Sequence, residues 1–131
     1  MNLLLRTLFA AILVAMLAVT SWASWHCPLF AVPRPVLGHP WFIATLFDAY
    51  AGFLTFYCWV CWKETGALSR ALWFVAIMLL GNIAMAIFML RELFTPAGPD
   101  GFASLLTRRR PPQPLLPAIL AAVAAGILVL A

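Results

Sequence analysis

The chain has 131 residues, of which 66% are hydrophobic and only 9% are charged. A soluble domain carries about 25% charged residues, so this composition excludes an ordinary soluble protein and predicts an integral membrane protein with one domain. The net charge of +4 comes mostly from arginines near the ends of apolar runs. There they face anionic lipid head groups, and the basicity does not indicate a nucleic-acid partner.

The first predicted transmembrane span covers about residues 3–25. Arg6 stands near its start, and its end is rich in tryptophan, which is enriched at membrane interfaces. A cleaved signal peptide is the alternative, because small residues at positions 21 and 23 are suited to a cleavage site. Residues 26–40 contain four prolines and Gly38, so we expect an extended connection on the membrane surface.

The second predicted span, residues 41–62, is the centre of the molecule. Its only charged side chain is Asp48, and Trp41 and Trp62 mark its two ends. At about 1.5 Å per residue it is long enough to cross a hydrocarbon core of roughly 30 Å. A carboxylate at this depth is costly without a partner or a water-filled cavity, so Asp48 is the first candidate functional residue.

The third predicted span is the apolar run 71–90, which ends at the charged pair Arg91–Glu92. A mobile loop rich in proline and arginine is expected at 95–114. Residues 115–131 then form a shorter fourth span or, alternatively, a tail helix lying against the bundle. In this last stretch Ala122 and Gly126 are spaced for close helix packing. The predicted fold is therefore an all-α membrane bundle of three spans plus a short fourth.

Basic residues give conflicting signals for membrane orientation. Arg6 and the loop containing Lys63 and Arg70 favour a cytoplasmic N-terminus. With four spans, however, the opposite side would hold more basic side chains, namely Arg34, Arg91, Arg108, Arg109 and Arg110. Since the first helix usually dominates, we expect the N-terminus inside. In a bacterial source the membrane would be the inner membrane.

A small polar face runs along the central span. Thr45, Asp48, Gly52 and Thr55 share one side of a helix, and we expect this side to point into the bundle. Counting helix rise from the shared membrane surface places Asp48 and Asn82 at the same depth, about 10–12 Å down.

A hydrogen bond between Asp48 and Asn82 is therefore expected, with Thr45 or Tyr50 added to the cluster. Gly81 in the next span is a further candidate packing residue. The functional alternative for this cluster is a small transporter in which Asp48 binds a proton or a cation.

Cys58 and Cys61 form a CxxC pair, which suggests a membrane thiol oxidoreductase as a second alternative. Such a pair normally lies at a helix N-terminus, whereas here it lies in the last turns, where the helix dipole has the wrong sign. Cys27 is expected on the opposite face of the membrane. The sequence has no metal-ligand motif or phosphate loop, and we expect no cofactor and no metal.

A set of residues also carries a family resemblance: Pro40–Trp41, Ala44–Thr45–Leu46, Asp48, Tyr50, Trp59, Lys63–Glu64, Trp73 and Gly81. Through them, His39–Leu93 resembles a family of small multi-pass membrane proteins of plants and bacteria that is described only as a domain of unknown function. The resemblance implies a membrane architecture and no activity. The sequence thus favours a non-catalytic accessory or scaffolding subunit, in a larger membrane complex or a homo-oligomer.

Overall fold

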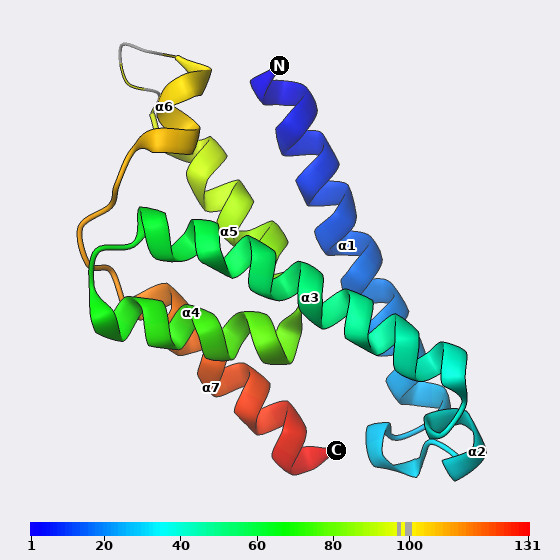
Figure 1. Ribbon diagram of the computed structural model, residues 1–131. Helices are drawn as coiled ribbons and strands as arrows, with labels where there is room; N and C mark the ends of the chain where they lie inside the picture. The colour runs from blue at the N-terminus through cyan, green and yellow to red at the C-terminus, as the bar shows by residue number, and fades with distance from the viewer. Residues whose placement is uncertain (97, 99–100) are drawn as a thin grey trace.

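The computed structural model describes residues 1–96, 98 and 101–131, and every regular element in these ranges is a helix (Figure 1). This confirms the predicted all-α class. In chain order the elements are α1 (Asn2–His26), the 3-10 turn η1 (Leu29–Ala31), α2 (Arg34–Leu37), α3 (Pro40–Lys63), α4 (Ala67–Leu80), α5 (Asn82–Phe94), α6 (Phe102–Thr107) and α7 (Leu115–Leu130).

Two of the helices, α1 and α3, are long and apolar enough to cross a membrane, with 25 and 24 residues. No residue of α1 is buried within the chain. Helix α3 begins where the sequence predicts, because Pro40 occupies the first turn and the His39 Nδ1 atom accepts a hydrogen bond from the Trp41 backbone N–H. The connection between them is not simply extended, since it contains η1 and α2.

The predicted continuous helix at 71–90 is wrong, because the chain breaks at Gly81 into α4 and α5. Gly81 has φ +53° and ψ −124°, a conformation that side-chain-bearing residues rarely adopt. A Cβ atom there would lie 2.6 Å from Cζ of Phe53 on α3, so glycine also permits close packing. The chain turns back at this point, and α5 returns toward the end of the molecule where α4 began (Figure 1).

The core lies between α3, α4 and α5, around Phe88. Its ring makes edge contacts with Phe56, Trp59 and Trp73, at centroid distances of 5.0–5.7 Å. Such geometry is the favoured one for aromatic pairs. Helix α1 packs along α5, and the Arg6 guanidinium near its start donates to the Leu93 carbonyl near the end of α5. The two helices therefore run antiparallel.

Helix α7 packs against α4, but not through the residues that the sequence suggests. The buried residues are Pro117, Ala121 and Ala124, which lie at i, i+4 and i+7 on one helix face. Ala122 and Gly126 are exposed, and nothing lies within 4 Å of a Cβ built on Gly126. The expected small-residue packing exists, but it uses a neighbouring face of the same alanine-rich helix.

The connection from α5 to α7, where the sequence predicts a mobile loop at 95–114, contains α6. Residues 97, 99 and 100 of that loop lie outside the described ranges. The last part of the connection follows the end of α3, because the Arg110 backbone N–H donates to the Lys63 carbonyl at 2.7 Å.

Candidate functional site

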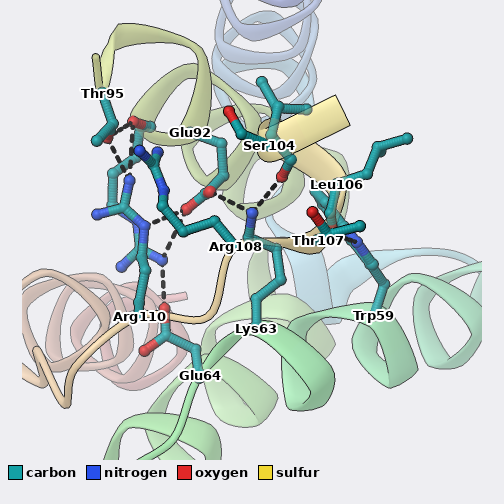
Figure 2. Close-up of polar contacts among 12 residues, drawn as sticks. Trp59, Lys63, Glu64, Glu92, Thr95, Ser104, Leu106, Thr107, Arg108 and Arg110 are labelled. Atoms are coloured by element: carbon teal, nitrogen blue, oxygen red, sulfur yellow. Dashed lines mark hydrogen bonds and ion pairs between the residues drawn. The ribbon is translucent and has the colours of Figure 1, made fainter. Parts of the chain in front are cut away.

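The most distinctive site is a cluster of five charged side chains at one end of the molecule, four of them buried and the fifth, Arg91, partly buried (Figure 2). Its members are Lys63 and Glu64 at the end of α3, Arg91 and Glu92 in the last turns of α5, and Arg110 in the connection to α7. Three segments that are distant in sequence meet here. We refer to these five residues as the ion cluster.

The Glu92 carboxylate is the centre of the ion cluster. Its Oε2 atom lies 2.6 Å from Lys63 Nζ, and both side chains have 0% of their surface exposed. Its Oε1 atom accepts from Arg110 Nε and lies 3.4 Å from an Arg91 nitrogen. Arg110 also donates to the Thr95 hydroxyl. Buried charges require such pairing, since an isolated ion in a low-dielectric interior is strongly disfavoured.

The Glu64 carboxylate is paired just as fully. Arg91 donates to Oε1, and the Ser69 hydroxyl donates to Oε2 at 2.7 Å. The guanidinium of Arg70 donates to the Glu64 backbone carbonyl at 2.7 Å. Arg91 also lies over the Trp73 and Phe88 rings, with its Cζ atom 5.1 and 4.7 Å from the centroids. Every carboxylate oxygen of the two glutamates thus has a cationic or hydroxyl partner.

The ion cluster is therefore suited to holding helices together and poorly suited to acid–base chemistry. A general base needs a carboxylate oxygen or imidazole nitrogen within reach of a substrate proton. Here the partners of the carboxylates are cations and a hydroxyl, and the Lys63 ammonium donates in addition to the Leu105 carbonyl. Three cations face two carboxylates, so the cluster keeps one net positive charge.

The sequence does not predict this site, because a charged pair after an apolar run is also typical of the end of a membrane span. In a chain with only four acidic residues, a Lys–Glu pair and an Arg–Glu pair at the ends of apolar runs are a signal for mutual pairing. That signal is hidden by the assumption of a straight third span, which separates Lys63 from Arg91 by the thickness of the membrane.

The predicted polar cluster in the middle of the chain is not assembled. Asp48 and Asn82 are both exposed, and no hydrogen bond joins them in the part of the chain that the structure describes. Thr45 donates to the Trp41 carbonyl, and Tyr50 makes an edge contact with Phe53. The expected bond fails because Asn82 is the first residue of α5, directly after the turn at Gly81, and not part of a straight helix crossing beside α3.

The small polar face of α3 also points differently from the expectation. Thr45, Asp48, Gly52 and Thr55 are all exposed and do not face the core of the chain. Nothing lies within 4 Å of a Cβ built on Gly52. Of the predicted helix-packing residues, only Gly81 is buried against another helix of this chain.

The three cysteines are free thiols. Cys58 is exposed, whereas Cys61 and Cys27 are partly buried. Cys58 and Cys61 lie in the last turns of α3, as the sequence indicates. A thiolate at this position gains nothing from the helix dipole, whose negative end is here.

The fold and the site together define an all-helical protein with two helices apolar enough to cross a membrane. Ion pairs join the end of α3 to α5 and to the connection before α7. Residues 2–107 match a protein family, DUF1475, whose description is "protein of unknown function". The chain belongs to this family.

The family match confirms the predicted membership and extends beyond His39–Leu93 in both directions. It includes four residues of the ion cluster, while Arg110 and α7 lie after it. No curated protein and no solved structure matches the chain.

Proposed function

We propose that this protein is a multi-pass integral membrane protein with a non-catalytic role, as an accessory or scaffolding subunit of a membrane assembly. The observation that carries the proposal is the division of its surface. Five of its twelve charged side chains pair with one another in the ion cluster. Large apolar side chains of α1 and α3 face outward instead, among them Leu4, Val14 and Phe47. Lipid is the natural environment for such a surface.

The proposed membrane topology follows from the turn at Gly81. Helices α1 and α3 span, while α4 and α5, with lengths of about 21 and 20 Å at 1.5 Å per residue, are too short to cross. They enter and return to the same side, because Glu64 before α4 pairs with Arg91 at the end of α5. Helix α7, about 24 Å long, starts at that side as well.

This topology removes the conflict in the charge count. With α4 and α5 forming a re-entrant pair, every Lys and Arg except Arg34 belongs to one end of the molecule. That end includes Arg6, which contacts Leu93, and the ion cluster. Positively charged ends of membrane proteins lie in the cytoplasm, so the N-terminus is cytoplasmic.

The two alternatives, a transporter that uses Asp48 and a thiol oxidoreductase, are tested by different variants. Transport through Asp48 requires an aqueous path at that residue, and the Asp48→Asn variant would then lose ion or proton movement with assembly unchanged. A thiol oxidoreductase would lose its function in a Cys58→Ser, Cys61→Ser variant. The pairing of Glu64 and Glu92 with cations supports a structural, non-catalytic role for the ion cluster.

Native mass spectrometry tests the proposal. The full chain is extracted gently from its own membranes, and the masses of the species that contain it are measured. A discrete heteromeric mass is expected for an accessory subunit. A monomer without any partner would contradict the accessory role, and liposome flux assays on that monomer would then measure transport directly. Recovery of the chain in the soluble fraction would contradict the membrane location itself.

A further inference from the structure

We propose that the exposed polar face of α3, formed by Thr45, Asp48, Gly52 and Thr55, binds a transmembrane helix of a different protein that presents a Lys or Arg side chain to Asp48. The inference rests on the proposed function, since it requires α3 to lie in the membrane. It goes further by assigning the docking surface and the chemistry of the partner.

Asp48 is the group on this face that requires a partner. It lies seven residues after Trp41, so about 10 Å inside the start of the span. The side chain is exposed on the helix surface, among apolar neighbours such as Phe47, which is 80% exposed. A carboxylate facing hydrocarbon at that depth is strongly disfavoured, and natural spans place such groups against another helix or a cavity.

The other polar groups of the face are already satisfied within α3. The Thr45 hydroxyl donates to the Trp41 carbonyl at 2.8 Å, and the Thr55 hydroxyl donates to the Ala51 carbonyl at 2.9 Å. They present small, nearly apolar surfaces to the outside. The face is therefore a row of small side chains in which Asp48 is the one group that still needs a partner.

The shape of the face fits a second helix. Its four residues follow each other at i, i+3, i+7 and i+10, which gives a stripe about 15 Å long. Gly52 lies in the stripe with open space above it, so the backbone of another helix can approach closely. The first half of α3 is mostly exposed, because α4 and α5 pack against its second half, from Phe53 onward.

Charge complementarity identifies the occupant. The cations of the ion cluster are committed to Glu64 and Glu92 beyond the far end of α3, so they do not neutralise Asp48. A second copy of the chain related by a two-fold axis would bring the same face, and therefore a second Asp48, to the contact. Like charges at close range are unfavourable, whereas a Lys or Arg from a different helix forms an ion pair.

Site-specific crosslinking in native membranes tests this assignment. A photo-reactive residue is placed at Thr45 or Thr55 on the face and, as matched controls, at Tyr50 or Leu54 on the opposite side of the same helix. We expect adducts from the face positions alone, with a transmembrane segment that contains Lys or Arg within one turn of the crosslinked residue. Asp48→Lys alone, or a change of the partner's basic residue to Asp alone, should reduce the yield of the adduct at least tenfold. The two changes together restore opposite charges and should restore the adduct.

Three further variants separate docking from folding. Gly52→Leu fits the open space within this chain but would obstruct a close helix, so it should abolish the adduct while the chain remains folded in the membrane. Phe47→Leu, next to Asp48 but off the face, should leave the adduct unchanged. Asp48→Asn keeps the size of the side chain and removes its charge, so it should lose the adduct if a cation is the partner.

Three outcomes would overturn the inference while leaving the membrane location intact. They are adducts of equal yield from both sides of α3, a crosslink to another copy of this chain, or a complex that survives Asp48→Asn. Failure of the chain to insert would be detected separately, by its extraction from membranes with carbonate, and that result would contradict the proposed function as well.

Discussion

Removing the charge of Glu92 should destabilise the protein more than any substitution on its surface. Glu92→Gln keeps the volume of the side chain but leaves Lys63, with 0% of its side chain exposed, and Arg110 without their shared carboxylate. Breaking a buried ion pair by removing one partner costs about 3–5 kcal/mol, because the remaining ion stays desolvated. The stability of a small domain is only about 5–15 kcal/mol, so the variant should be close to unfolding.

Reversible unfolding of the full chain in mixed micelles measures the loss, with tryptophan fluorescence as the signal. The matched control Arg34→Gln changes an exposed cation and should stay within about 0.5 kcal/mol of the wild type. Adding Lys63→Met to Glu92→Gln removes the stranded ammonium and should recover about 1–3 kcal/mol through coupling between the two residues. A loss below about 1 kcal/mol for Glu92→Gln, or additive effects in the double variant, would refute the assignment of a tight buried pair.

Two further predictions concern the turn and the topology. In the same unfolding assay Gly81→Ala should destabilise the protein by about 1–3 kcal/mol, because it adds backbone strain and a close contact with Phe53. The control Gly52→Ala should be neutral or stabilising by up to about 1 kcal/mol. Equal effects of the two substitutions would show that Gly81 does not require its positive φ. The orientation is tested in a cysteine-free chain that carries either Val36→Cys or Gln113→Cys. Val36→Cys should react with an impermeant maleimide added outside intact cells, whereas Gln113→Cys should react only after the cells are permeabilised. Labelling of both positions from one side would refute the proposed orientation.

The sequence predicts the long helices well because their signals are local. Tryptophans and a proline mark the ends of α3, and the structure begins that helix at Pro40, next to the predicted start. The composition alone leads to the all-helical class. These signals depend on residues within one segment, where helix length and hydropathy are direct consequences of the side chains.

The break at Gly81 could not be predicted from the same kind of signal. A glycine in an apolar run is as consistent with close packing in a continuous helix as with a turn, and only the backbone angles distinguish them. A straight helix over 71–90 predicts that Asn82 lies beside Asp48 and that Arg91 lies across the membrane from Lys63. Both wrong predictions concern contacts between segments that are distant in sequence, and these contacts depend on the backbone angles at Gly81.

The ion cluster and Gly81 together account for the choice between one continuous helix and two helices, α4 and α5, that turn back at Gly81. Residues 71–90 are apolar enough to cross as one helix, so hydropathy does not oppose a straight arrangement. A straight helix would, however, carry Arg91 and Glu92 away from Lys63 and Glu64, so that Glu92 would lose Lys63 and Glu64 would lose Arg91. Since burying ions contributes little net stability even when they are paired, we infer that the cluster serves mainly to select the arrangement in which α5 returns to the start of α4.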